Sequence, residues 1–204
     1  QTLSGPGSLT YTGATTVNNG TLTLFSTGLA AASAVTVDGA TSTLSLAGAG
    51  AQGLKGNAVT ISNGGTVDDA TTGGVTHDIG ALVFAAGGTL SSSHSSPGFL
   101  GNYSIAGNVS VSGNGLALIN ADEISLSGGV KEFTVADDTA GTDLRIDSDI
   151  ILALDLTKLG AGTMELTGAN TYTGTTTVEA GTLLVNGDNS GATGDVNVNS
   201  GGTL

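Results

Sequence analysis

Short runs in which β-branched or aliphatic residues alternate with polar ones recur along the whole chain. Examples are Val35-Thr-Val37, Val59-Thr-Ile61 and Val109-Ser-Val111. A period of two places every second side chain on the same face, which predicts half-buried β-strands. Asn-Gly pairs lie between several of these runs and supply the positive φ angles that tight corners need. The pattern therefore predicts an all-β protein of short strands joined by corners.

The spacing of the corners predicts how the strands are arranged. An apolar residue follows a Gly- or Thr-containing corner in steps of 22, 23, 23 and 26 residues, and later of 19 and 21, at Leu22, Leu44, Val67, Leu90, Leu116, Met164, Leu183 and Leu204. A period of this length is typical of one turn of a parallel β-helix and not of a hairpin sandwich. We expect one domain over residues 1–204, a right-handed parallel β-helix (solenoid) of about nine rungs. Its inward-facing side chains are expected to include Leu22, Val37, Val59, Leu183 and Val196.

One segment of the chain occurs twice. Residues 11–24 (YTGATTVNNGTLTL) and 172–185 (YTGTTTVEAGTLLV) match at a constant offset of 161. The correspondence continues from Val35 to Val196 and from Val37 to Val198. Such repetition is typical of proteins built from stacked units.

The second copy belongs to a longer pattern, KLGAGTMELTGANTYTGTTTVEAGTL over residues 158–183. This pattern resembles the passenger-associated repeat of autotransporters, also called the autotransporter-associated β-strand repeat, at Lys158, Gly160, Gly162, Leu166, Asn170, Tyr172, Gly174, Val178, Gly181 and Leu183. Met164 replaces one Leu of the family pattern, and the first copy lacks the Gly-Ala-Asn stretch. The resemblance implies a secreted or surface-displayed bacterial passenger with a β-helical stalk. It leads us to expect a segment of a longer passenger or fibre, located outside the cell or on its surface.

Composition and charge exclude several classes of partner. The sequence has 35 Gly, no Trp and no Cys, and its 17 acids against 4 bases give a formal net charge of −13. Nucleic acids and anionic lipids require Lys and Arg clusters, so binding to nucleic acid is not expected. No apolar run approaches the roughly 20 residues that cross a bilayer, so direct membrane insertion of this segment is not expected either.

Two segments depart from the regular spacing of strands and corners. Residues 91–103 contain SSSHSSPG and predict a loop that projects from the rod. Residues 117–160 hold nine of the 17 acids, which predicts a strongly negative side of the rod there.

The most specific candidate for chemistry is the run Asp143, Arg145, Asp147 and Asp149, which alternation places on one face of a strand. Paired carboxylates in a surface groove can cleave or bind glycans. Phe133 is the one aromatic residue nearby that could stack on a sugar, and exposed charge runs are usually solvated faces. We therefore expect these four side chains to be exposed and without a cleft, and retain a glycan site as the alternative.

Other motifs do not indicate a cofactor or a metal. The G-x-G-x-x-G run at residues 48–53, with Asp68 and Asp69 beyond it, precedes a predicted strand, whereas a dinucleotide site needs a helix. Thr-x-Thr pairs could bind ice only if they kept one register on consecutive rungs, and the middle rungs lack them.

The titratable side chains outside that run also lack the spacing of known sites. Asp137, Asp138 and Asp143 do not follow a calcium-loop pattern. His77 and His94 lie in separate segments without Cys, which argues against zinc, and the Ser-His-Ser run at residues 93–95 lacks a third positioned group. We expect no catalytic, cofactor or metal site.

These observations favour a non-enzymatic structural β-helix, either an adhesin-like stalk or a subunit of a head-to-tail fibre. The alternatives are a carbohydrate-active β-helix, as a lyase or hydrolase, and a glycan-binding surface at residues 143–149. Neither terminus resembles a polar capping repeat. We therefore expect either end-to-end self-association or covalent continuation of the solenoid, with a host surface or a glycan as a further partner.

Overall fold

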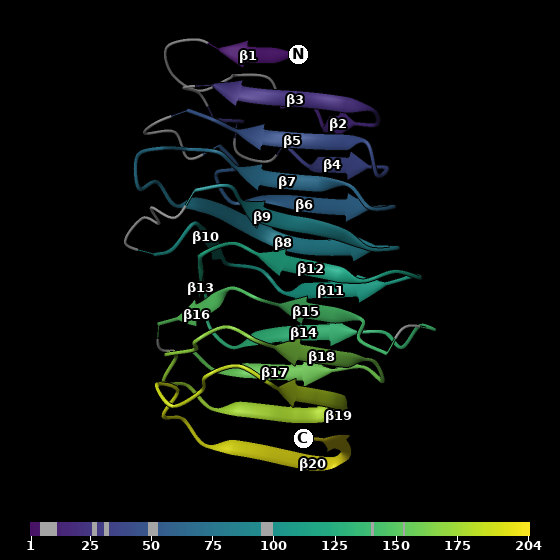
Figure 1. Cartoon of the computed structure of the whole chain (residues 1–204), viewed down its shortest axis with the longest axis vertical. Coiled ribbons are helices and arrows are strands. Elements are labelled where there is room, and N and C mark those ends of the chain that lie inside the picture. Colours follow the sequence, from purple (N-terminus) through teal and green to yellow (C-terminus); the bar gives the residue numbers. More distant parts are fainter. Residues whose placement is uncertain are drawn as a thin grey trace.

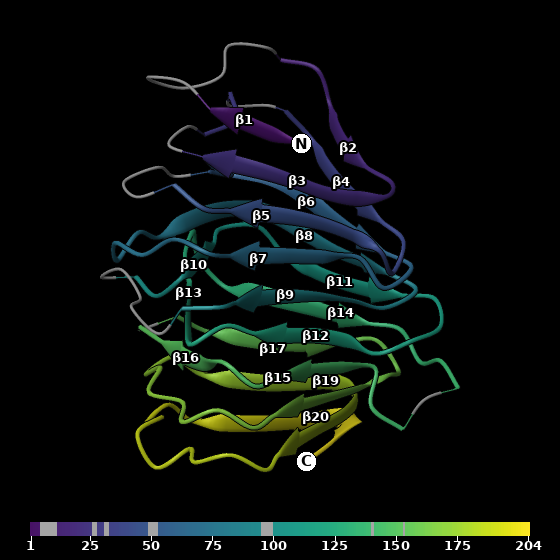
Figure 2. The same cartoon turned by 45° about the horizontal axis from the view of Figure 1, so that its top comes forward.

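The computed structural model describes residues 1–4, 12–25, 28–30, 33–48, 53–94, 100–139, 141–152 and 154–204. Within these ranges the protein forms 20 strands, all of whose mutual pairings are parallel. They coil into a right-handed parallel β-solenoid of about 8 turns, which confirms the predicted fold (Figures 1 and 2). The described ranges contain no helix of the length and apolarity that a bilayer span requires.

Three stacks of strands, which we call ladders, form the walls. The first ladder runs the whole length of the rod and comprises β2 (Thr15–Val17), β4 (Val35–Asp38), β6 (Asn57–Ser62), the second half of β8 (His77–Ala85), β11 (Val109–Ser112), β14 (Lys131–Val135), β17 (Leu156–Leu159) and the first parts of β19 (Thr176–Val185) and β20 (Val196–Thr203). Its strands run in the opposite direction to those of the second ladder across the rod (Figure 1).

The second ladder is equally long. It comprises β1 (Thr2–Ser4), β3 (Gly20–Phe25), β5 (Ser42–Leu46), β7 (Thr66–Asp69), β9 (Gly88–Ser92), β12 (Ala117–Asn120), β15 (Leu144–Ile146), β18 (Thr163–Leu166) and the last parts of β19 and β20. A short third ladder is added in the middle of the rod by the start of β8, β10 (Tyr103–Ile105), β13 (Glu123–Leu126) and β16 (Asp149–Ile151).

Side chains in equivalent positions of successive strands form continuous inward-facing columns. One column of the first ladder contains nine side chains, those of Thr15, Val35, Val59, Leu82, Val109, Phe133, Lys158, Val178 and Val198. A column of the second ladder runs through Leu22, Leu44, Val67, Leu90, Ile119, Ile146, Leu166 and Val185. Burying one aliphatic side chain stabilises the fold by about 1.5–3 kcal/mol, so these columns supply most of the stabilising burial.

One expected inward residue is exposed. Val196 is 50% exposed, because no further described strand packs on β20. Two of the apolar residues that mark the corner spacing are also exposed, Leu116 just before β12 and Leu204 just after β20. Val37, Val59 and Leu183 are buried as predicted, and Leu22 is partly buried against the core.

The two ends of the predicted projecting loop, residues 91–103, lie in strands. Ser91 and Ser92 belong to β9, and Tyr103 begins β10. Asn102 and Tyr103 are buried, so both ends of the predicted range are part of the solenoid. Residues 95–99, which include Pro97, lie outside the described residues.

Candidate functional site

A polar surface hollow lies where three successive turns leave the second ladder. We call it the corner hollow. It has a volume of about 430 Å³ and is lined by Ser92, Ser93, His94, Asn120, Ala121, Asp122, Asp147 and Asp149. Its residues come from the end of β9 and the segment after it, from the end of β12 and the segment after it, and from the connection between β15 and β16 with the first residue of β16. The fold thus brings His94 together with two of the four residues of the predicted glycan site.

The other two predicted site residues are placed differently. Asp143 is only 1% exposed, which corrects the expectation of an exposed side chain. It precedes β15, where its carboxylate accepts hydrogen bonds from the backbone N–H of Asp138 (3.0 Å) and of Thr163 (2.7 Å). Arg145 pairs with Asp147 through its Nε atom at 2.5 Å, beside the hollow. The four side chains therefore do not share one exposed face, and the expectation of no cleft is also wrong for Asp147 and Asp149.

The carboxylates around the hollow are held by hydrogen bonds between turns. Asp149 accepts from the N–H of Ala169 (2.6 Å), and Asp147 accepts from the Thr167 hydroxyl in addition to Arg145. Asp155, outside the hollow, repeats the pattern with the N–H of Thr175 (2.7 Å). Each acceptor lies 20 residues before its donor in the next turn, so these acids connect one turn to the next.

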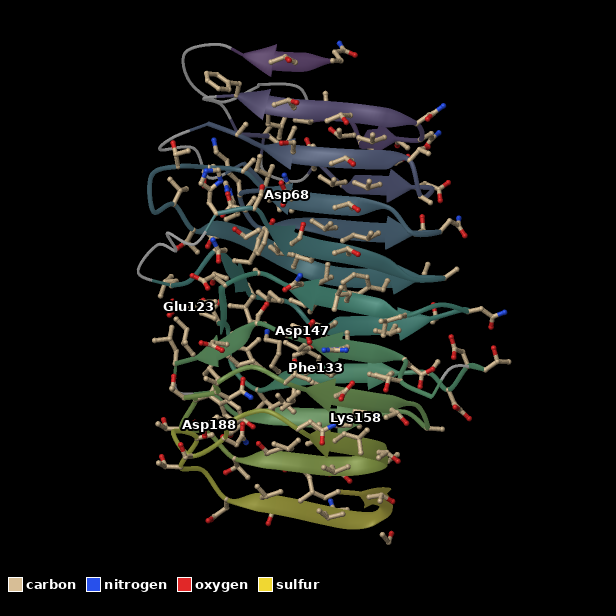
Figure 3. The ribbon with its side chains drawn as sticks, viewed as in Figure 1. Asp68, Glu123, Phe133, Asp147, Lys158 and Asp188 are labelled. Carbon is tan, nitrogen blue, oxygen red and sulfur yellow. The ribbon has the colours of Figure 1, made fainter. Side chains whose placement is uncertain are left out.

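Burial and mutual repulsion shift two pKa values near this region. Burial, and then the neighbouring Asp122 and Asp149, raise the pKa of Glu123. Burial, followed by interaction with Asp138, raises the pKa of Asp143, although the N–H of Thr163 opposes the shift. Glu123 lies toward one edge of the rod (Figure 3) and stands in register with Asp149 of the next turn. A ligand that enters the hollow therefore meets a negative, hydroxyl-rich surface.

A buried polar cluster lies beside the hollow, and the sequence analysis did not foresee it. Asp69 is 1% exposed and follows Leu24 and Leu46 in an inward column. Its Oδ1 accepts from the Thr71 N–H (2.9 Å) and from His77 Nε2 (3.2 Å). Burial opposes ionisation, but hydrogen bonds from His77 and Thr71 lower the pKa of Asp69.

Both ring nitrogens of His77 are used within this cluster. The N–H of Gly53 donates to Nδ1 at 3.0 Å, so Nδ1 carries the lone pair and Nε2 carries the proton. Tyr103 packs against the imidazole at 5.9 Å between ring centroids, and burial raises its own pKa. The cluster is a structural element, because a buried His with two partners has no free nitrogen for a substrate.

Asn102 connects this cluster to the hollow. Its Nδ2 donates to Asp69 Oδ2 (3.0 Å) and to Ser92 Oγ (3.1 Å), while its Oδ1 accepts from the N–H of Asp122 (3.1 Å). Ser92 in turn donates to the backbone carbonyl of His94 (2.7 Å). The signal that sequence analysis could have used is the acid at position 69, where alternation requires an inward aliphatic residue.

The remaining motifs are placed as follows. Among the described residues, no group of three or more His, Asp or Glu side chains is arranged to hold a metal ion. Residues 49–52 of the glycine motif lie outside the described residues, and the strand β6 follows it.

The threonine pattern is more regular than the sequence suggested. Outward-facing residues Thr21, Thr43, Thr66 and Thr89 stack in one register on four consecutive turns. The adjacent outward column contains Thr23, Ser45, Asp68 and Ser91. After Thr21 and Thr23, the Thr-x-Thr pairs are therefore broken by Ser45, Asp68 and Ser91. Asp68 accepts hydrogen bonds from the hydroxyls of Ser91 (2.9 Å) and Ser93 (2.6 Å).

Within the carboxyl-terminal repeat, Lys158 is a buried cation in an aliphatic column. It is 0% exposed and lies between Phe133 and Val178 (Figure 3). Its Nζ donates to the backbone carbonyls of Leu159 (3.0 Å), Gly160 (2.8 Å) and Ala180 (3.1 Å). Burial lowers the pKa of Lys158 to about 8, with Asp143 opposing the shift. The ammonium thus supplies a hydrogen-bond donor to backbone carbonyl oxygens at the corners of two consecutive turns.

Other residues of this repeat allow the turns to stack closely. Asn170 accepts from the N–H of Ile150 (3.0 Å) and donates to Asn189 Oδ1 (2.9 Å), which joins three turns. A Cβ atom at Gly174 would lie 2.0 Å from the carbonyl oxygen of Leu154 in the preceding turn. The repeat pattern therefore encodes contacts between turns, not a reactive site.

Comparison with known proteins agrees with this interpretation. The model of the Passenger-associated-transport-repeat family matches residues 1–24 and 156–185. Two segments of this chain are therefore similar to the passenger-associated-transport repeat. The second matched segment contains Lys158, Asn170 and Gly174, the three residues whose contacts join consecutive turns.

A curated relative supports the same family. The sequence is similar to the Adhesin BmaC autotransporter of Brucella suis biovar 1 (strain 1330), with 38% identity over 86 residues. The aligned part covers 42% of this chain and 2% of that protein, so the chain spans only a small fraction of its relative. No solved structure shows a significant match.

Proposed function

We propose that this chain is a non-enzymatic segment of a bacterial surface passenger that serves as an adhesin-like β-helical scaffold. The observation that carries the proposal is the unbroken inward column of nine side chains, to which two passenger-associated-transport repeats contribute. The named function of the similar adhesin autotransporter supports the same role. Extracellular or cell-surface location is part of this proposal.

Attachment can be measured directly. The protein, displayed on a non-adherent bacterium, is expected to increase binding to host cells or extracellular matrix relative to a display vector alone. A matched control replaces Val37 by Asp, which places a charge in the neighbouring inward column between Val17 and Ile61 and should abolish the gain. Equal attachment by all three strains would refute the adhesin-like role.

A second candidate is glycan binding at the corner hollow without cleavage. It is favoured by the convergence of His94, Asp147 and Asp149 with the Asn120 amide and two Ser hydroxyls, all groups that bond to sugar hydroxyls. Binding of a panel of neutral and amino-sugar oligosaccharides should perturb the NMR signals of these residues. Asp122→Asn should weaken that binding, and reproducible cleavage abolished by Asp147→Asn would instead support the enzyme alternative.

The fibre proposal concerns β20. Val196, Val198 and Leu204 are exposed there, and Val196 and Leu204 line an apolar hollow of about 470 Å³ with Tyr172 and Leu183. These exposed side chains support the proposal that another solenoid turn packs on β20, supplied by a continuing polypeptide or by a second copy. Sedimentation over a range of protein concentrations separates the two sources, because only a second copy makes the sedimentation coefficient rise with concentration.

A further inference from the structure

Four Asn-Gly pairs occur in the sequence, and the structure distinguishes one of them chemically. In such a pair the backbone nitrogen of Gly can attack the amide carbon (Cγ) of the Asn side chain, since Gly has no side chain to obstruct it. The pairs are Asn19-Gly20, Asn63-Gly64, Asn114-Gly115 and Asn186-Gly187. Their reactivity depends on how firmly the Gly N–H is held.

Three of the four Gly nitrogens are held by good hydrogen bonds. Gly20 donates to the carbonyl of Thr41 at 3.0 Å, Gly115 to the carboxylate of Asp138 at 2.8 Å, and Gly187 to the carbonyl of Leu166 at 3.0 Å. The N–H of Gly64 has only the carbonyl of Gly87 at 3.5 Å, beyond the range of an ordinary N–H···O bond.

The Asn63-Gly64 corner is also open to water. Both residues are exposed, and both have positive φ angles, 50° and 80°. The N–H of Gly65 donates to the carbonyl of Ser62 at 3.0 Å, so residues 62–65 form a type I′ turn. Water needed for the second step of the reaction can therefore reach the corner.

We propose that Asn63 is a site of spontaneous deamidation in the folded protein. The Gly64 nitrogen forms a bond to Asn63 Cγ, the bond between Cγ and Nδ2 breaks, and ammonia leaves. Water then opens the cyclic imide at either carbonyl and leaves aspartate or isoaspartate at position 63. Water is the one co-reactant, and no group is oxidised or reduced.

The product changes an inter-turn contact. Asn63 Nδ2 donates to Asp38 Oδ1 at 2.6 Å, and hydrogen bonds from Asn63 and then from Ser62 lower the pKa of Asp38. Deamidation replaces the donor by a carboxylate that faces Asp38. The corner that joins β6 to β7 then repels the preceding turn, which loosens the contact between them.

Timed incubation at neutral pH followed by peptide mapping with mass spectrometry tests the site. We expect Asn63 to deamidate about fivefold faster than the other three Asn residues, the ratio that corresponds to one missing hydrogen bond of about 1 kcal/mol. In denatured protein the four rates should become similar. A rate at Asn63 equal to or below those of the other three in folded protein would overturn the proposal.

Two variants test whether a negative charge at position 63 loosens the contact with the preceding turn, independently of the deamidation reaction. Asn63→Asp mimics one product, and Asn63→Gly removes the hydrogen bond without adding charge and tolerates the positive φ angle at this position. We expect a lower Tm for Asn63→Asp than for Asn63→Gly at neutral pH, with the difference shrinking in high salt as repulsion is screened. Equal Tm values at low salt would show that the new charge does not loosen the corner.

Discussion

The buried cation Lys158 provides the sharpest test of how the turns are held together. Replacing it by Met keeps the length and apolar stem of the side chain but removes the ammonium. Three backbone carbonyls, those of Leu159, Gly160 and Ala180, then lose their donor. The variant therefore isolates the hydrogen bonds from the packing of the column.

The loss of stability expected for Lys158→Met follows from two opposing contributions. Three hydrogen bonds from a charged donor contribute about 1.5 kcal/mol each, or roughly 4–5 kcal/mol together. The pKa of Lys158 falls from 10.5 to about 8, which corresponds to a cost of roughly 3 kcal/mol for burying the charge. The side chain is fully buried, so this cost applies in full. Lys158→Met should therefore lower the free energy of unfolding by about 1–2 kcal/mol at neutral pH.

The burial of Lys158 also predicts how the free energy of unfolding changes with pH. Below pH 8, Lys158 is protonated in both the folded and the unfolded protein. Between pH 8 and 10.5 the unfolded state keeps a proton that the folded state has released, so the free energy of unfolding rises with pH. The gap between the native protein and Lys158→Met should widen by about 3 kcal/mol over this window.

Denaturant titration monitored by circular dichroism at several pH values measures both effects. Lys131→Met is a matched comparison, because Lys131 is equally buried but donates to one carbonyl, that of Ala106 (2.6 Å). Its substitution should cost about 1 kcal/mol. A Lys158→Met protein as stable as the native one at neutral pH, or a gap that narrows above pH 8, would refute the reasoning.

Three further predictions concern packing and buried polarity, and thermal or denaturant unfolding checks each. Gly174→Ala should cost at least about 3 kcal/mol, because its Cβ would lie 2.0 Å from the Leu154 carbonyl oxygen, whereas Gly141→Ala, with open space around it, should be nearly neutral. Val37→Asp should prevent folding of the first turns, because the new charge would be buried without a partner. Val196→Asp, at a half-exposed position, should lower the free energy of unfolding by less than about 1 kcal/mol. A similar loss of stability in the two variants would contradict the assignment of inward columns. Asp69→Leu restores an aliphatic column but removes the carboxylate that accepts hydrogen bonds from His77, Thr71 and Asn102. It should therefore lower the free energy of unfolding by at least about 3 kcal/mol. A variant more stable than the native protein would contradict this prediction.

The repeating parts of the fold could be predicted from the sequence. Alternation identified Val37 and Val59 as inward residues, because a period of two admits only one buried face once the strand is placed. Val196 satisfies the same pattern and was predicted incorrectly, since burial in a solenoid depends on a strand in the next turn and not on the residue itself. Local sequence specifies which way a residue faces, while its neighbours along the rod decide whether it is covered.

The polar interior could not be predicted in the same way. Asp69 and His77 come from different strands and are joined with Asn102, which is 33 residues from Asp69. Hydrogen bonds over such distances depend on the number of residues in each turn, and this number varies where the third ladder begins. The same reason explains Asp143, whose position beside Arg145 in the sequence suggested an exposed face although the structure buries it.

The distribution of charge along the rod follows from the way that turns are connected. Two of the four basic side chains, Lys131 and Lys158, and two of the 17 acids, Asp69 and Asp143, are buried, so the outer surface keeps the strong negative charge of the composition. The carboxylates of several surface acids nevertheless accept hydrogen bonds from backbone N–H groups of the next turn, as Asp149 does from Ala169. A carboxylate that accepts such a bond stabilises the stacking and still presents its second oxygen to solvent. The acidic surface and the cohesion of the solenoid therefore have a common origin, and neutralising these acids to change a partner's affinity should also weaken the rod.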